Sequence, residues 1–587
     1  MPSFNRKVLF YPAIILVYLA TNYFVYRAGD LIFSDTFFHN IIPLLIFCLF
    51  TAILYTTTKN LDKKRHKEHF CYSISIIFTL TIVMPFFFID VPHAWKAPDI
   101  SYNVAKIWRA YDGHLFVDAV TGYLSIYPSI FHLFWGGIMH IVPMTAPKAL
   151  VMSTIFHVAF LMFSSFILMK KLFDISTAAL TTMLVGLIFY LPNIANTMLA
   201  INNTFSYGFF ILGLYFFYRG YYENASFLKY AGLLFGFSTA LWPHYLFLLL
   251  VLLVVFIMFE KRKKNLLKKL LVLFSFYLIP LIYLVVHTIV VAQKHLLGSQ
   301  RFGFSHGIPD FQWLSEFIYR FFSLGGYLYT GKGTVIFFSI TYIMLFSLAF
   351  YRLFFYKGEP EKHKPSKNRE KFFIKIICLG FILALLVLFY FFGHTYPRRT
   401  QILMNVLVVG LSANFLLAMV SSRTNLRVVG ISLISFFVVT SVYYNTYKNK
   451  AIAGESQNTY LNYLKFEKPV VDKIASLTNR EDRIFSTREG FRSLIMANIP
   501  RYGLISHRDG NYFYLYSKLS AEILNDYNAI LSTRDLSTLN SLMEKYSMQY
   551  SLLIKYEIRN YPGLQTMYQN YEKVFEDRNF VILKRSK

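Results

Sequence analysis

Long apolar blocks separated by short polar connections fill most of the first three quarters of this chain. They recur between Val8 and Val442, for example as PAIILVYLATNYFVY, FIKIICLGFILALLVLFYFF and VVGISLISFFVVTSVYY. A helix needs roughly 17 to 25 apolar residues to cross a hydrocarbon layer about 30 Å thick. The first block has too long an apolar core for a cleaved signal, and no small-residue cleavage site follows it. The pattern therefore predicts a polytopic membrane protein.

Composition supports this reading, because 56% of the 587 residues are hydrophobic and 15% are charged. The formal net charge of +28 comes from basic residues gathered in connections such as KNLDKKRHKEH and EKRKKNLLKK. Such clusters are typical of cytoplasmic loops of membrane proteins. No basic-aromatic repeat or zinc-finger spacing accompanies them, so we expect no nucleic-acid partner. The three cysteines lie in or beside apolar blocks and predict neither a disulfide framework nor a cysteine metal site.

A polar segment from Val91 to Ser125 interrupts the apolar pattern. Spans near 8–26, 40–57 and 71–89, with the N-terminus inside, place this segment on the outer face. If the aromatic block 127–143 then crossed the membrane, the downstream basic turns would face outward. We therefore expect 127–143 to be a re-entrant or juxtamembrane helix, and about thirteen spans in all.

The same arrangement gathers several polar turns on the outer face. One is Trp242-Pro243-His244, where proline breaks an apolar stretch of about thirty residues into a short hairpin. Another is GHTYPRR, which holds His394, Arg398 and Arg399.

Composition changes after about Asn445. The chain therefore divides into a membrane domain, residues 1–447, and a soluble outer domain, residues 448–587. In the second, helix-like KPVVDKIASLTN and LSTLNSLMEKYS alternate with strand-like DRIFST, RYGLIS, YSLLIKYE and NFVILKR. This alternation predicts a small α/β domain.

Three short motifs resemble integral-membrane glycosyltransferases of the GT-C type, which use polyprenyl-phosphate sugars. They are Ala97-Pro98-Asp99-Ile100-Ser101-Tyr102, followed by an amphipathic stretch; Ile126-Tyr127-Pro128-Ser129-Ile130-Phe131; and Pro147-Lys148-Ala149. The likeness is greatest to the arabinofuranosyltransferase that adds the first arabinose to cell-wall galactan in mycobacteria and corynebacteria. The chain departs from that family at Ser129 and Ile130, where a small residue or proline would precede a glycine.

This resemblance implies an all-α polytopic membrane domain of the GT-C type with a C-terminal extracytoplasmic α/β domain. It implies a polyprenyl-phosphate sugar as donor, a cell-envelope glycan as acceptor, and the bilayer as surroundings. The family carries an acidic residue in its first large external loop, which corresponds here to Asp99. We expect no cofactor, and the need for a divalent metal is left open.

Lipid-phosphate sugar transfer requires a base near the acceptor hydroxyl and groups that hold the departing phosphate. Asp99 is the candidate base, although carboxylates at membrane boundaries are often solvated loop residues or helix caps. Asp118 is either a second catalytic acid or a loop residue. Asp112, in the sequence YDGH, reads as a turn residue.

Arg398 and Arg399 are candidate ligands of the donor phosphate, because arginine can bind phosphate through two nitrogens at once. The alternative is that they are interfacial arginines. His394 lies beside them, and His244 on another outer turn is a further candidate, with a packed structural histidine as its alternative.

Two other functions remain open from the sequence. A polymerase or ligase of lipid-linked glycans would use a large late loop, and the outer loop His295–Lys332 contains Asp310 and Glu316. A secondary transporter would carry broken helices and charged residues near mid-membrane, which this pattern does not favour.

Overall fold

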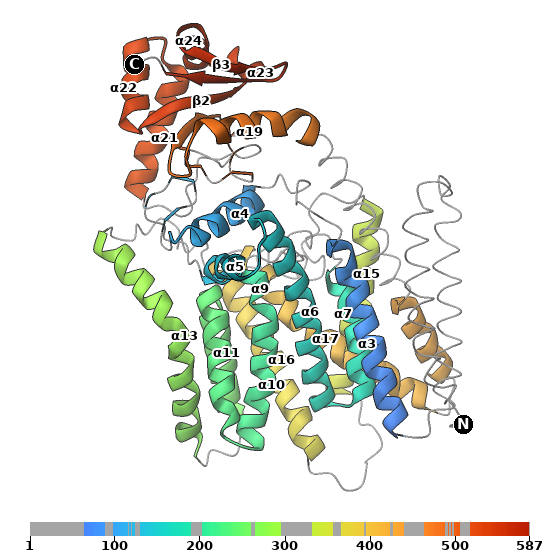
Figure 1. The fold of residues 1–587 in the computed structure, drawn as a ribbon. Helices are drawn as coiled ribbons and strands as arrows, with labels where there is room; N and C mark the ends of the chain where they lie inside the picture. The colour runs from blue at the N-terminus through green and yellow to red at the C-terminus, as the bar shows by residue number, and fades with distance from the viewer. Residues whose placement is uncertain are drawn as a thin grey trace, which may run out of the picture.

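The computed structural model describes residues 64–87, 98–114, 130–189, 202–259, 265–294, 332–355, 366–392, 395–422, 426–438, 463–487 and 517–585, and parts of 117–123 and 491–504. A bundle of helices carries a smaller domain at one end (Figure 1). The described helices of the bundle are α3 (Lys64–Phe87), α6 (Ala146–Leu172), α7 (Ile175–Phe189), α9 (Asn202–Phe205), α10 (Tyr207–Tyr222), α11 (Phe227–Leu241), α12 (Tyr245–Phe259), α13 (Leu266–Lys294), α15 (Lys332–Phe354), α16 (Ser366–Phe392) and α17 (Thr395–Ser421). Two further helices, α4 (Pro98–Tyr111) and α5 (Ile130–Ile141), lie between the bundle and the smaller domain.

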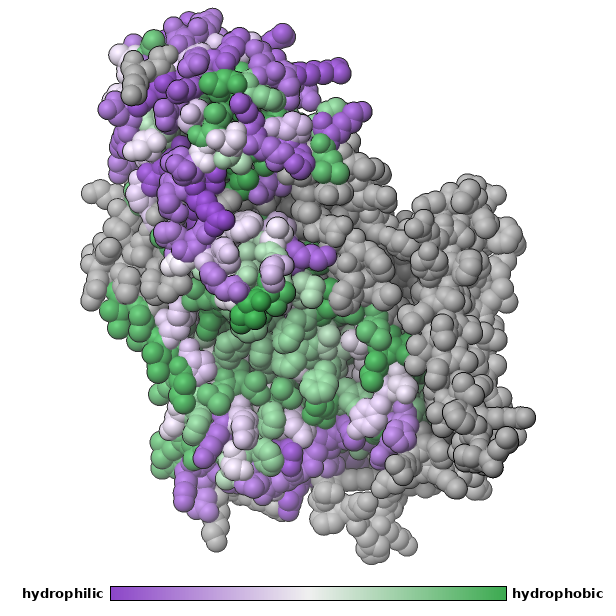
Figure 2. All heavy atoms as spheres, viewed as in Figure 1, coloured by the Kyte–Doolittle hydropathy of each residue, from purple (hydrophilic) through white to green (hydrophobic). Residues whose placement is uncertain are grey.

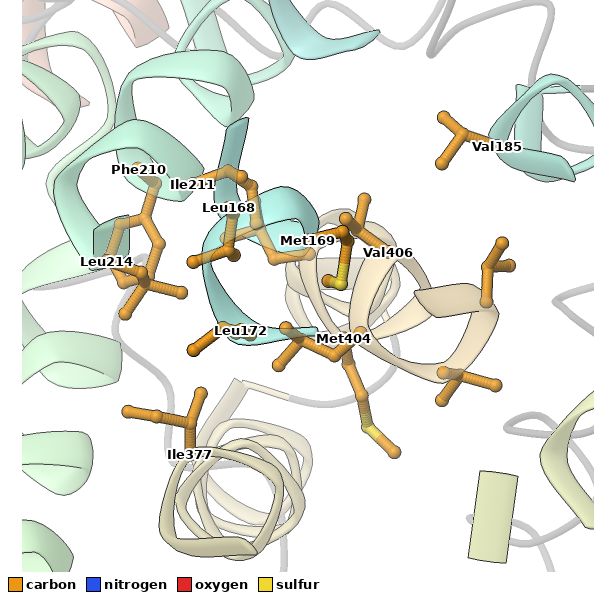
Figure 3. Packing of buried hydrophobic residues seen from close by; sticks show 14 of the residues in the cluster. Leu168, Met169, Leu172, Val185, Phe210, Ile211, Leu214, Ile377, Met404 and Val406 are labelled. Atoms are coloured by element: carbon orange, nitrogen blue, oxygen red, sulfur yellow. The ribbon is translucent and has the colours of Figure 1, made fainter. Parts of the chain in front are cut away.

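Helix α6 is central to the bundle and packs against α3, α7 and α10. One large cluster of buried apolar side chains joins it to α16 and α17. Leu168, Met169 and Val406 lie in this cluster, seen from close by in Figure 3. A Cβ at Gly410 would meet the sulfur of Met169, so the long side chain of Met169 fills the space beside Gly410 of α17.

Four of the described helices are long and apolar enough to cross a membrane, namely Ala146–Leu172, Leu266–Val286, Arg369–Leu388 and Gln401–Ser421. Several shorter apolar helices accompany them. The surface has a hydrophobic belt between a hydrophilic cap and a hydrophilic lower rim (Figure 2). These features indicate a membrane protein.

Basic residues gather at the bundle end that lies away from the smaller domain. Lys170 and Lys171 end α6, while Arg219 and Arg352 lie in the last turns of α10 and α15. Lys171 and Arg219 both pair with Glu223. The opposite end of α6, at Ala146, packs with α4 and α5. The charge distribution therefore distinguishes the two ends of the bundle.

The smaller domain is a four-stranded sheet with helices, as the sequence predicts. Strand order is β1-β2-β4-β3; β1 pairs with β2 in parallel and the other pairs are antiparallel. The strands are β1 (Arg483–Ser486), β2 (Met548–Ile554), β3 (Glu572–Glu576) and β4 (Phe580–Lys584). The helical elements are η1 (Tyr463–Glu467), α19 (Lys468–Leu477), α21 (Ser517–Ser532), α22 (Leu536–Lys545), α23 (Lys555–Ile558) and α24 (Pro562–Asn570).

Two predicted strands differ from the structure. In RYGLIS, Tyr502 forms only an isolated bridge with Arg483. The reason is that the Gly503 amide donates instead to the carbonyl of Val120, in the loop after α4. In YSLLIKYE, β2 ends at Ile554 and the chain continues as helix α23.

Several predicted elements of the membrane domain can be compared with the structure. The predicted span near 71–89 coincides with α3 up to Phe87, and its last two residues lie outside the described ones. The helix break at Trp242-Pro243-His244 separates α11 from α12. In the block 127–143, α5 has 12 residues. At 1.5 Å per residue it is about 18 Å long, shorter than a hydrocarbon layer. The spans near 8–26 and 40–57 lie outside the described residues, so the count of about thirteen stays a prediction.

We predict that the domain end of the bundle faces out of the cell, because basic turns prefer the cytoplasmic side. Tyr556→Cys, at an exposed position of the smaller domain, should react with a membrane-impermeant maleimide in intact cells. Asn224→Cys, in the exposed turn between α10 and α11, should react only after permeabilisation. Both variants are made with the native cysteines replaced. The reverse labelling pattern would contradict this orientation.

Candidate functional site

Helix α4 lies at the junction of the bundle and the C-terminal domain. Pro98 occupies its first position, where the missing N–H of proline costs nothing. On one side, Val104 and Ile107 pack in a cluster with Phe131 and Leu150 of the bundle side. On the other side α4 packs against the C-terminal sheet, through the shared apolar cluster of Tyr102, Ala105, Val120, Ile474, Ile484 and Ile582. The helix is thus held by two hydrophobic cores.

Helix α5 supports α4 from the bundle side. A Cβ at Gly136 would lie 2.8 Å from the backbone nitrogen of Tyr111, so glycine is needed for this close crossing. Near the start of the two helices, His132 Nε2 and Asn103 Oδ1 are 2.8 Å apart. Near their ends, His140 Nε2 lies 2.9 Å from the carbonyl oxygen of Tyr111. Two histidines of α5 therefore contact α4 at different positions along the helix pair.

The loop after α4 folds around the buried carboxylate of Asp118. Its Oδ1 accepts hydrogen bonds from the Val120 amide at 3.0 Å and from the Thr121 amide at 2.8 Å. The Thr121 hydroxyl also donates to Oδ1, and the Tyr102 hydroxyl donates to Oδ2 at 3.0 Å. A carboxylate that accepts several local hydrogen bonds organises its loop.

Lys106 is buried in the middle of α4, with 1% of its surface exposed. Its ammonium donates to the carbonyl of Val117 at 2.8 Å. Burial lowers the pKa of Lys106 to about 8, and the charge of Asp118 opposes this shift. Burial and the nearby Lys106 charge hold the pKa of His132 well below its usual value. His132 is therefore neutral at physiological pH.

Arginines join the far end of α4 to the C-terminal domain. The guanidinium of Arg109 stacks over the ring of Tyr502, 3.4 Å from its centroid, and donates to the carbonyl of Arg480 at 3.2 Å. Arg480 in turn forms an ion pair with Asp112, which lies in the turn after α4 as predicted. Arg483 donates to the carbonyl of Thr121 at 2.8 Å. These contacts fix α4 and the loop after it against residues about 370 positions later in the chain.

Those predicted site residues whose backbone the structure describes all lie at the same end of the bundle. Asp99 is the second residue of α4. His244 follows Leu241, whose side chain packs in the cluster beneath α4, and its ring stacks on Trp242. His394 lies outside the described residues.

Arg398 and Arg399 are the fourth and fifth residues of α17. Sixteen residues after Arg398, the Asn414 amide donates to Thr177 Oγ1 at the basic end of the bundle. At 1.5 Å per residue, the first turn of α17 is about 24 Å away along the helix axis, towards the end that carries α4. Asp99, His244 and the two arginine positions therefore share one end of the bundle.

Sequence reasoning missed the buried polar residues Asn103, Lys106, Arg109 and His132. The available signal was spacing, because Asp99, Asn103 and Lys106 follow one another at intervals of four and three residues on one helix face. Within the described ranges, no three His, Cys, Asp or Glu side chains gather closely enough to hold a metal ion.

Lys106 gives the fold a specific pH dependence. Below about pH 8 this lysine is protonated in both the folded and unfolded states, and its buried charge disfavours folding. Between about pH 8 and 10.5 the folded protein releases the proton while the unfolded chain keeps it, so stability rises with pH. We predict a gain of about 3 kcal/mol over this range relative to Lys106→Met. Unfolding in detergent measures both proteins, and parallel pH profiles would contradict the prediction.

The sequence matches no protein-family model, and no curated protein matches it. Its structure is similar to ArnT from Cupriavidus metallidurans, with a TM-score of 0.55 and 12% identity. The match covers 86% of this chain and 97% of ArnT. ArnT bound to undecaprenyl phosphate matches with a TM-score of 0.54 and 11% identity, over 89% of this chain and 98% of that one.

Arabinofuranosyltransferase AftD from Mycobacteria is also similar, with a TM-score of 0.54 and 11% identity. That match covers 89% of this chain and 40% of AftD. At such low identity the likeness concerns the fold. The chain has the fold shared by these GT-C glycosyltransferases.

Proposed function

We propose that this protein is a membrane glycosyltransferase that moves a sugar from a polyprenyl-phosphate donor to a cell-envelope glycan. The observation that carries the proposal is the likeness, over nearly all of both chains, to ArnT bound to undecaprenyl phosphate. An amphipathic helix held at the junction of an apolar bundle and a hydrophilic domain supports it. At the junction of the bundle and the hydrophilic domain, the tail of a lipid donor can lie among apolar helices while its phosphate and sugar are exposed to water.

Asp99 is the proposed general base. Its carboxylate takes the proton of the acceptor hydroxyl as the acceptor oxygen bonds to the anomeric carbon. The bond between that carbon and the phosphate oxygen breaks, and the electron pair leaves with the polyprenyl phosphate. The start of α4 suits this role, because the rest of α4 is buried on both sides and holds the position of its first residues.

We propose that Asp118 stabilises the conformation of the loop after α4. Two roles were open for it, a second catalytic acid and a loop residue. Its buried carboxylate already accepts hydrogen bonds from Tyr102, Val120 and Thr121, which favours the loop role.

Arg398, Arg399, His394 and His244 are the proposed ligands of the donor phosphate. Positive groups at this end would stabilise the charge that grows on the leaving phosphate. Arabinofuranose is the proposed sugar and galactan the proposed acceptor, on the sequence resemblance and the structural likeness to AftD. The outer face is the proposed side of transfer, because basic turns occupy the opposite end of the bundle.

Asp99→Asn should abolish most transfer, because a general base contributes about 100- to 10,000-fold to rate. The matched control is Asp112→Asn, which removes a carboxylate charge paired with Arg480 at the opposite end of α4 from Asp99. Initial transfer rates are compared at equal protein concentration, with thermal unfolding as a check on folding. Near-normal activity of Asp99→Asn would remove Asp99 as the base, and a selective loss in Asp118→Asn would assign that role to Asp118.

Replacing Arg398 and Arg399 together by Gln should raise the donor KM at least tenfold, because each charged hydrogen bond is worth about 1.5–3 kcal/mol. Lys375→Gln provides the control, since Lys375 is an exposed cation near the start of α16. Donor KM is measured at saturating acceptor. An unchanged KM in the double variant would reduce these arginines to interfacial anchors.

A further inference from the structure

We infer that the buried Asn103–His132 hydrogen bond is a positioning device for the catalytic turn of α4. The inference rests on the proposed function, with Asp99 as base. Asn103 lies one helical turn after Asp99, so the bond between α5 and Asn103 fixes the part of α4 nearest to the proposed base.

The chemistry of the pair defines its protonation. Asn103 Oδ1 can only accept, so His132 Nε2 carries the hydrogen that it donates. The two side chains are almost completely buried, at 4% and 0% exposure. Burial, and after it the nearby charge of Lys106, lowers the pKa of His132, which keeps the ring in this neutral, donating form. The direction of the hydrogen bond is therefore defined, from His132 Nε2 to Asn103 Oδ1.

The packing of α5 makes His132 a firm anchor. The neighbouring Phe131 is fully buried in the cluster that joins α4, α5 and α6. The rings of Phe131 and Phe205 meet edge to face with centroids 5.3 Å apart. The packing of α5 on the bundle therefore fixes the place of His132 and, through the hydrogen bond, of Asn103. A displacement of a reacting group by about 1 Å can lower the rate about 100-fold.

A second histidine on the same helix supplies a control. His140 also contacts α4, through the carbonyl oxygen of Tyr111. Tyr111 lies twelve residues after Asp99, and this contact is exposed. If α4 needed only general support from α5, loss of either histidine would have a similar effect. A positioning role for the first turn requires His132 alone to matter.

The test measures kcat and donor KM for His132→Leu, His132→Gln and His140→Leu, with unfolding temperature for each. We expect His132→Leu to lower kcat about 10- to 100-fold with donor KM changed less than about threefold. His132→Gln retains an N–H donor and should recover most of kcat. His140→Leu should remain within about twofold of wild type.

The double variant Asn103→Leu/His132→Leu separates positioning from stability. Removing both partners avoids an unsatisfied buried oxygen, so unfolding temperature should return towards wild type. We expect kcat to stay low in this variant. Recovery of kcat together with stability, or equal losses in His132→Leu and His140→Leu, would overturn the inference. Full activity of Asp99→Asn would instead reject the proposed base and leave the effect of His132 to be explained otherwise.

Discussion

The structure depends on the burial of α4 between two hydrophobic cores. Apolar residues on one side of this helix belong to the cluster above the bundle, and those on the other side cover a face of the C-terminal sheet. Each buried aliphatic or aromatic side chain contributes about 1.5–3 kcal/mol. A helix of 14 residues thus joins the helical bundle to the C-terminal domain, and its removal would expose apolar side chains on both.

Polar contacts add specificity to this apolar sandwich. The Arg109–Tyr502 stack and the Arg480–Asp112 ion pair define one register of α4 against the C-terminal domain, and the Asp118 carboxylate orders the loop after α4. Burying Lys106 among these groups costs free energy, which the apolar burial on both sides must offset. A polar group kept at such a cost beside a proposed reacting centre is typical of functional sites.

Local chemistry made part of this architecture predictable. Pro243 marked the end of a helix, and the short apolar runs in DRIFST and NFVILKR, set between helix-like stretches, marked β1 and β4 correctly. Strand β3 was missed because EKVFE is a charged, exposed edge strand with a weak apolar pattern. The docking of α4 on the C-terminal domain was not predictable, since Arg109 and Arg480 are separated by 371 positions. Lys106 and His132 looked like ordinary polar residues of an amphipathic stretch and a half-buried helix, because their burial depends on how α4, α5 and the C-terminal domain pack together.

The most direct test of the account is donor turnover by the purified wild-type protein in lipid nanodiscs. The protein is incubated with polyprenyl phosphates that carry different pentoses or hexoses, together with a galactan acceptor, and released polyprenyl phosphate is measured. The account predicts release from at least one donor, with arabinofuranose as the first candidate, and matching transfer of sugar to the acceptor. Absence of release from every donor, by protein whose cooperative unfolding transition establishes that it is folded, would contradict the central claim.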